Sequence, residues 1–179
     1  MRYSPQTVQW IYDSPLGPLH LAASPEGLCG AWFQGQRHAP AQLLGEQAWP
    51  RQAHHPVLLR AQQQLQAYFA GEAVDFDLPL DLGSGTGFQQ AVWRALLDIP
   101  RGRSSAYGRL AAALGRPQAS RAVGAAVGRN PVSIIVPCHR VLGAQGALTG
   151  YAGGLERKVA LLQLEGLGLP LQAFGQEAA

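Results

Sequence analysis

The chain has 179 residues, of which 47% are hydrophobic and 14% charged, so it is not an intrinsically disordered polypeptide and is long enough for one domain or two small ones. No segment is apolar and long enough to span a membrane, residues 1–5 lack the apolar core of a secretory signal, and two cysteines make no disulfide framework, which together predict a cytoplasmic protein. The net charge of +3 is the sum of −3 over residues 1–82 and +6 over residues 83–179, where almost all of the positive charge comes from arginine. This basic second part is typical of a phosphate-binding surface or of an ordinary solvated face.

The first part of the chain predicts three strands separated by turns. Its candidate strands are rich in β-branched and aromatic residues or alternate roughly between apolar and polar positions, and turns containing Pro and Gly separate them. The three predicted strands cover residues 7–12, 19–23 and 28–33. A polar, irregular connection rich in Gln, His and Pro follows at residues 36–55.

A helix and a further strand complete this first part. Apolar positions at helical spacing predict a helix over residues 56–70 that ends at Gly71. Alternating apolar residues at 76–80 predict a short strand. The glycine-rich segment 81–87 then predicts a linker between two domains, of which the first covers residues 1–82.

The second part is predicted to be mostly helical. Four helices follow from apolar residues at helical spacing and from Gly and Pro at their ends, with Thr86 as the N-cap of the first. They cover residues 88–96, 105–114, 118–128 and 155–164. The second and third helices, joined by a turn that contains Gly115, form a helix-turn-helix pattern, which occurs in DNA-binding proteins and in many other helical pairs. The apolar residues at 133–136 predict a short buried strand.

Cys138 is the strongest candidate for chemistry in the chain. It follows the predicted strand and Pro137, so we expect its side chain at a strand end, where it can line a pocket. His139 and Arg140 come directly after it, and a neighbouring cation lowers the pKa of a thiol from about 8.5 and increases the thiolate population. The pattern favours a nucleophilic cysteine over a buried structural one.

The segment 137–141 (PCHRV) resembles the active-site signature of the O6-alkylguanine-DNA alkyltransferases, also called methylated-DNA–protein-cysteine methyltransferases. Further motifs occur in the family's order and cover most of the second part of the chain. They lie at residues 107–108 (YG), 120–124 (SRAVG), 130–131 (NP), 149–154 (TGYAGG) and 161–166 (LLQLEG). A weaker similarity at residues 13–17 and 27–30 extends through the first part. An ordered series of this kind does not arise by chance.

The resemblance implies two domains with different folds. Residues 1–82 are expected to form an α/β domain with a ribonuclease-H-like fold. Residues 83–171 are expected to form a mostly α-helical domain, with a winged helix-turn-helix-like DNA-binding element beside the cysteine pocket. Residues 172–179 are expected to form a loose tail.

The resemblance also assigns roles around the cysteine. Cys138 would be the nucleophile and alkyl acceptor, His139 would remove its proton through a bridging water, and Glu165 would orient the imidazole. Asn130 would hold the turn between the recognition helix and the active-site strand. Tyr107 would donate a hydrogen bond to the guanine ring as negative charge develops there.

The same family pattern identifies residues for DNA binding and base recognition. Arg121 is similar to the family's arginine finger, which fills the gap left by an extruded nucleotide, and the small residues from Ala119 and Ser120 onward allow close approach to the duplex. Tyr107 also counts among these DNA contacts. The expected wall of the base pocket consists of Val127, Gly128, Leu148, Tyr151, Ala152 and Gly153.

Two features depart from patterns found in parts of the family. Ala152 stands where some members carry a serine that binds the lesion oxygen, so a backbone amide is expected to substitute for it, with more room for alkyl groups larger than methyl. Pro5 and Ser24 stand where some members have zinc ligands, so no structural metal is expected, and no cofactor either.

The expected function is repair of double-stranded DNA by irreversible, single-turnover transfer of an alkyl group from O6-alkylguanine to Cys138, because nothing in the chain can cleave the thioether product. We expect a monomer without a membrane partner, in the cytoplasm or on the nucleoid, whose DNA binding is independent of sequence and weakened by salt. Repair of O4-alkylthymine and cooperative binding stay open. Two alternatives remain: a non-catalytic protein that flags alkylated DNA, and a cysteine hydrolase that uses Cys138 and His139.

Overall fold

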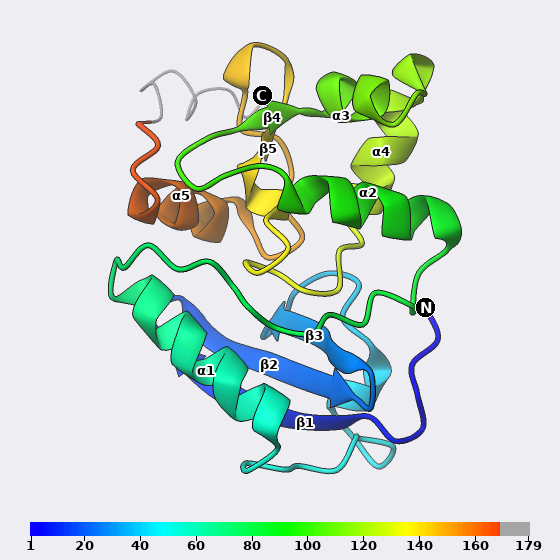
Figure 1. Ribbon diagram of the computed structural model, residues 1–179, viewed down its shortest axis with the longest axis vertical. Coiled ribbons are helices and arrows are strands. Elements are labelled where there is room, and N and C mark those ends of the chain that lie inside the picture. Colours follow the sequence, from blue (N-terminus) through cyan, green and yellow to red (C-terminus); the bar gives the residue numbers. More distant parts are fainter. Residues whose placement is uncertain (169–179) are drawn as a thin grey trace, which may run out of the picture.

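The computed structural model describes residues 1–168, and the loose tail expected at residues 172–179 lies outside this part. Two regions are stacked in Figure 1, with a sheet and one long helix in the lower half and a helical region in the upper half. This arrangement confirms the predicted combination of an α/β domain followed by a mostly helical one. None of the described helices is long and apolar enough to cross a membrane.

The lower region contains three antiparallel strands in the order β1-β2-β3. They span Val8–Ser14, Gly17–Ser24 and Gly27–Phe33, each within two residues of its predicted bounds. In their register Trp10 pairs with Leu21, which pairs in turn with Ala31. The turn before β3 requires Gly27, because its φ is 146° and a Cβ there would collide with the Pro79 carbonyl.

Helix α1, Pro56–Phe69, lies across one face of this sheet (Figure 1). Proline suits the first helical position, because its φ is already helical and its missing N–H would have no partner there. Leu58, Ala61 and Leu65 are buried at helical spacing, and Tyr68 continues the same stripe. The side chain of Tyr68 reaches beyond the sheet into the upper region.

The strand predicted at residues 76–80 does not form. Its apolar residues are half-buried in alternation with exposed ones, but only Leu80 makes a β-bridge, with Leu28. The Pro79 carbonyl accepts a hydrogen bond from Leu28 N at 2.7 Å, but proline has no N–H to extend the ladder. The segment therefore runs along the sheet edge in an extended conformation without becoming a strand.

The upper region begins with α2, Gly87–Leu97, and its N-terminus is the predicted one. Thr86 Oγ1 accepts a hydrogen bond from Gln89 N, and the Gln89 side chain accepts one from Thr86 N, so the two residues form a capping box. The buried indole N–H of Trp93 donates to the Ala126 carbonyl at 2.8 Å. This bond ties α2 to the second helix of the helix-turn-helix.

The helix-turn-helix consists of α3, Tyr107–Ala113, and α4, Ser120–Val127, connected through a 3-10 turn at Pro117–Ala119. Both helices start two residues later than predicted. Before α3, strand β4, Ser105–Ala106, pairs in parallel with β5, Val141–Leu142. Pairing with a segment far along the chain overrides the local helical pattern at this point.

The strand predicted at residues 133–136 is also absent. Val132 makes one β-bridge, with Ala31, and the chain then turns, with Ile134 at a φ of 72°. All four residues are buried, so the apolar run indicated burial and not strand geometry. The thiol consequently lies in a 3-10 turn, Cys138–Arg140, instead of at a strand end.

Helix α5, Leu155–Leu164, has its predicted bounds and contacts the lower region. Arg157 on this helix donates to the Leu16 carbonyl at 3.0 Å, and in the loop before the active-site turn Ser133 donates to the Gln36 side chain at 3.0 Å. A continuous hydrophobic cluster joins the two regions into one packed body. Two further 3-10 turns lie in loops, at Ala41–Leu43 and Ala144–Gly146.

Candidate active site

Asn130 organises the loop that carries the thiol. Its buried amide Nδ2 donates to the carbonyls of Val136 (2.8 Å) and Val132 (3.3 Å) and to Cys138 Sγ (3.0 Å). Its Oδ1 accepts a hydrogen bond from Val132 N at 3.0 Å. One side chain therefore closes the turn and places a donor on the sulfur, where it stabilises a thiolate more than a thiol.

The two cysteines have different surroundings. Burial raises the pKa of Cys138, while the bond from Asn130 and the charge of Lys158 act in the opposite direction. Its thiol is therefore protonated at neutral pH and needs a base to become a nucleophile. Burial and the charge of Asp81 raise the pKa of Cys29 to about 12, so this second thiol is unreactive.

His139 is the base next to the thiol, and it is completely buried. Its Nε2 lies 2.8 Å from Glu165 Oε1, so the proton of the neutral ring is on Nε2, and Nδ1 keeps a lone pair. Nδ1 has no hydrogen-bonding partner within residues 1–168. Burial lowers the pKa of His139 against the raising effect of Glu165, so the ring is neutral and able to take a proton.

Glu165 directly follows α5 and is held by Arg140. The guanidinium donates from Nε to Oε2 at 2.8 Å and from Nη2 to Oε1 at 2.9 Å. Burial alone would raise the pKa of Glu165, but the hydrogen bonds from His139 and Arg140 hold it well below its usual range. Arg140 had no predicted role of its own in the site, although its position in the PCHRV motif places it two residues after the cysteine.

Two further buried residues were missed. Tyr68 of α1 donates from its hydroxyl to Glu165 Oε1 at 2.8 Å. Lys158 of α5 donates from Nζ to the carbonyls of Val141 (2.6 Å) and Thr149 (2.8 Å), and burial lowers its pKa to about 8 against the raising effect of Cys138. In the sequence, Tyr68 is indistinguishable from a core aromatic residue and Lys158 from a surface cation.

A pocket of about 410 Å³ lies beside α4. The predicted residues Tyr107, Gly128 and Ala152 line it, together with Arg37 and Thr149, whose Oγ1 donates to the Tyr107 hydroxyl at 3.4 Å. Four predicted wall residues are absent from this lining, because they pack into the interior or lie beside it: Val127, Leu148, Tyr151 and Gly153.

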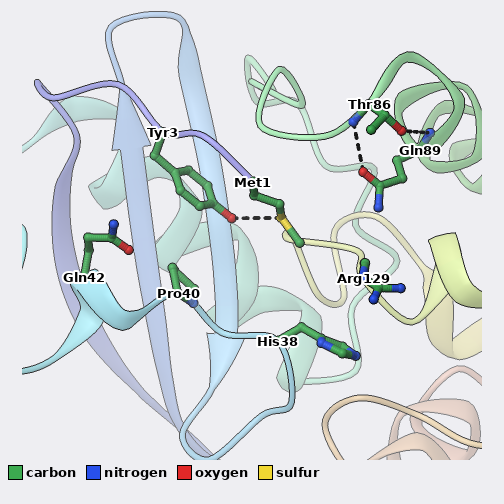
Figure 2. Close-up of a pocket in the computed structure, with 8 residues that line it drawn as sticks. All are labelled: Met1, Tyr3, His38, Pro40, Gln42, Thr86, Gln89 and Arg129. Atoms are coloured by element: carbon green, nitrogen blue, oxygen red, sulfur yellow. Dashed lines mark hydrogen bonds between the residues drawn. The ribbon is translucent and has the colours of Figure 1, made fainter.

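A second pocket of about 480 Å³ was not predicted. It shares His38 and Arg129 with the first, so the two pockets adjoin. Figure 2 shows these two side chains, with the capping residue Thr86 above them and Met1 and Tyr3 to their upper left. The Tyr3 hydroxyl donates to Met1 Sδ at 3.2 Å. The junction of the two pockets therefore carries the guanidinium of Arg129 and the imidazole of His38.

Three of the four residues predicted to contact DNA lie where α4 begins, and the fourth, Tyr107, is the first residue of α3. Arg121 is in the first turn of the helix and is exposed, whereas Ser120 and Ala119 are half-buried. Two more exposed arginines, Arg109 and Arg116, lie on α3 and in the turn that follows it. The helix-turn-helix therefore presents several guanidinium groups to solvent, as a phosphate-binding surface requires.

Two family models match the chain. The ribonuclease-like domain of 6-O-methylguanine DNA methyltransferase matches residues 8–82. The DNA-binding domain of 6-O-methylguanine DNA methyltransferase matches residues 87–167. The second match contains Cys138, His139 and Glu165, and the first contains Tyr68.

Curated relatives and solved structures agree with these matches. A methylated-DNA–protein-cysteine methyltransferase of Mycobacterium tuberculosis (strain H37Rv) is 50% identical over 153 residues, which are 86% of this chain and 88% of the relative. Another, from Methanosarcina acetivorans, is 48% identical over 156 residues, 87% of this chain and 96% of the relative. The crystal structure of M. tuberculosis OGT in complex with DNA is similar with a TM-score of 0.77 and 48% identity, covering 89% of this chain and 91% of that one.

Proposed function

The chain belongs to the 6-O-methylguanine DNA methyltransferase family, and on this premise we propose that Cys138 is the residue that accepts the alkyl group. The activity is DNA repair by transfer of an alkyl group from damaged DNA to a cysteine of the protein. The observation that carries the assignment is the side-chain array around this thiol, with Asn130 on the sulfur and the adjacent His139 oriented by Glu165. Cys29 has no comparable surroundings.

The proposed reaction begins with removal of the thiol proton. His139 Nδ1 accepts this proton through a bridging water, because Nε2 is already bonded to Glu165. The hydrogen bond from Asn130 and the charge of Lys158 stabilise the resulting thiolate.

The thiolate then attacks the saturated carbon bonded to guanine O6. A carbon–sulfur bond forms as the carbon–oxygen bond breaks, and the bonding electrons pass to the guanine ring, where Tyr107 donates a hydrogen bond. The ring takes up one proton and becomes guanine. The protein keeps a thioether at Cys138, which water does not hydrolyse, so each molecule acts once.

We propose double-stranded DNA carrying O6-alkylguanine as the substrate, with O4-alkylthymine as a second candidate. The target atom lies inside the base stack, so the nucleotide has to be extruded into the pocket beside α4 while Arg121 fills the gap. Ala152 leaves room in that pocket, which favours alkyl groups larger than methyl. The proposed form is a monomer of the cytoplasm that associates with the nucleoid when it is bound to DNA.

We assign the domain boundary to residues 82 and 83. The proposed first domain, residues 1–82, contains the sheet and α1, and the proposed second domain, residues 83–171, contains the DNA-binding helices and the thiol. Residues 169–171 of this assignment lie outside the described part of the chain.

Intact-protein mass tests the assignment of the acceptor. After incubation with excess duplex that contains O6-methylguanine, we expect a single gain of about 14 Da, one methylene, in the wild-type protein and none in Cys138→Ala. If the wild-type mass does not change although the protein binds the lesion tightly, the chain is a flagging protein. Repeated turnover of an ester or amide would instead identify a cysteine hydrolase.

A further inference from the structure

Three segments that are far apart in the sequence converge on the carboxylate of Glu165. Arg140 comes from the active-site turn, Glu165 itself from the end of α5, and Tyr68 from α1 in the lower region. Oxygen Oε1 accepts hydrogen bonds from Tyr68 and Arg140 and also faces His139 Nε2, with all three distances between 2.8 and 2.9 Å. The atom that orients the catalytic imidazole is therefore shared with a residue outside the DNA-binding region.

Tyr68 is held firmly in this position. It is 1% exposed, and its ring lies 5.4 Å from Phe69 and 5.7 Å from Phe76, between ring centroids. The guanidinium of Arg101 lies 5.5 Å above the same ring. A phenol packed on all sides loses little conformational entropy when it makes its hydrogen bond, so the hydroxyl is a preorganised donor.

Arg101 also connects the chain segments that carry Tyr68 and Glu165. Its Nη2 donates to the carbonyl of Gly71, two residues after the end of α1, at 3.1 Å, and to the carbonyl of Leu164, the last residue of α5, at 3.1 Å. The ends of α1 and α5 are thus joined by one side chain on the loop that follows α2. The hydroxyl and the carboxylate are held together from both backbones.

We propose that Tyr68 is a positioning residue for the alkyl-transfer reaction, through which the N-terminal region fixes the orientation and basicity of the Glu165–His139 pair. The proposal rests on the proposed role of Cys138. Tyr68 does not touch the reacting atoms, so it acts only through Glu165.

The hydroxyl contributes in two ways. A carboxylate oxygen with an additional donor attracts the imidazole proton less strongly, so His139 stays neutral down to a lower pH and remains available as the base. The same bond also limits rotation of the carboxylate, which keeps the imidazole of His139 in one orientation through its Nε2 contact with Oε1. Without the hydroxyl, Oε1 becomes more basic, the imidazolium form is favoured, and a larger fraction of His139 is already protonated at a given pH.

The test is single-turnover alkyl transfer by Tyr68→Phe, which keeps the packed ring and removes only the hydroxyl. Rates are measured between about pH 5 and pH 9 with lesion-bearing duplex and with a free O6-alkylguanine base, which reacts without DNA binding. We expect a maximal rate about tenfold lower with both substrates, an unchanged half-saturating DNA concentration, and an acid limb of the pH–rate profile shifted to higher pH. The control is Tyr12→Phe, which removes a hydroxyl from a ring that stacks on Phe69 at 6.5 Å, and it should match the wild type.

Each other outcome overturns the proposal in a recognisable way. A Tyr68→Phe protein with wild-type rates and pH profile would show that the bond is incidental. A slower reaction with an unmoved acid limb and a lower melting temperature would assign Tyr68 a purely structural role. A defect confined to duplex DNA would assign it to DNA binding. If the wild-type protein itself does not take up the alkyl group, the role of Cys138 fails first, and this parallel measurement separates the two failures.

Discussion

At the residue scale, the site is built from buried polar groups that hydrogen-bond to one another, and two of these groups take part in most of the bonds. Asn130 bonds the backbone of the loop and the sulfur, and Glu165 receives donors from three side chains. A buried network of this kind stabilises the fold while it is complete and is costly when one member is removed, because the remaining groups lose their partners in a medium without water. Substitutions here should therefore affect stability and reactivity together.

Asn130→Ala should lower the free energy of unfolding by about 1–3 kcal/mol, because it leaves the Val132 amide unpaired in the interior and removes one of the two hydrogen bonds to the Val136 carbonyl. The same change removes the donor on Cys138, so alkyl transfer should slow at neutral pH. Urea unfolding followed by far-UV circular dichroism measures the first effect, and single-turnover kinetics the second. An unchanged unfolding midpoint would mean that the loop does not depend on this amide.

The stability of the protein should depend on pH through Glu165. Its folded-state pKa lies below the value of about 4.3 found in unfolded chains, so its ionised form stabilises the fold above that pH, and this contribution is lost as the pH falls toward the folded-state pKa. Glu165→Gln, which leaves the Arg140 charge uncompensated, should be clearly less stable than the wild type at pH 7. The difference in free energy of unfolding between the two proteins should become smaller as the pH falls below about 5, because the wild type then loses the contribution of the ionised Glu165.

Urea midpoints for the wild type and Glu165→Gln at several pH values check this expectation. Asp77→Asn is the matched control, because Asp77 pairs with Arg60 on the surface, where ion pairs contribute little. A gap between wild type and Glu165→Gln that stays constant down to acidic pH would contradict the depressed pKa.

At the scale of elements, the spacing of apolar residues predicted every long helix. It gave wrong predictions for segments whose conformation depends on hydrogen bonds to residues elsewhere in the chain. The bounds of α1 and α5 follow from apolar spacing together with Pro and Gly signals, and the cap of α2 from Thr86. The segment 133–136 has the composition of a buried strand, but Asn130 side-chain bonds fold it into a turn. Such bonds join residues several positions apart through a side chain, which no periodicity of apolar residues reports.

The loop after α2 contains a close approach that a single methyl group should disturb. Gly102 has a φ of 69°, and a Cβ there would lie 3.0 Å from the Glu165 carbonyl oxygen. Gly115 has the same φ, but no heavy atom lies within 4 Å of its Cβ position. Backbone strain should lower the free energy of unfolding of both alanine variants by about 1 kcal/mol. Gly102→Ala should be destabilised further, because its methyl group also displaces Glu165.

Thermal or urea unfolding of the two variants, together with their transfer rates, separates strain from contact. Gly115→Ala should keep the wild-type transfer rate, whereas Gly102→Ala should react more slowly. Equal stabilities and equal rates for the two variants would show that the loop relaxes away from Glu165.

At the scale of the whole molecule, the ordered motifs allowed the fold class and family to be predicted, and the charge asymmetry placed the basic residues in the half that carries the helix-turn-helix. The contacts between the two halves were not predictable. Tyr68 and Glu165 are separated by 97 positions, and neither has a neighbour in the sequence that signals the other. Such a contact becomes visible only when the two regions are packed together.

DNA binding should follow from the same charge distribution. The logarithm of the binding constant for undamaged duplex should fall roughly linearly with the logarithm of the salt concentration, with little dependence on sequence. Titrations at several salt concentrations check this.

Arg121→Ala should slow alkyl transfer on duplex DNA but not on a free alkylguanine base, because only the duplex contains a base stack whose gap has to be filled. The control is Arg60→Ala, which makes the same charge change on α1. Equal slowing on both substrates would place Arg121 in the chemical step instead of base extrusion.

The convergence of Tyr68, Arg140 and Glu165 also bears on whether the two regions could work apart. Arg140 and Glu165 belong to the upper region, whereas Tyr68 belongs to α1 of the lower one. An upper region on its own would keep Cys138, His139 and Glu165 but would lose one donor to Oε1 and the packing that keeps water from it. The helical region therefore contains every group assigned to the reaction, but the environment of those groups is completed by the sheet region.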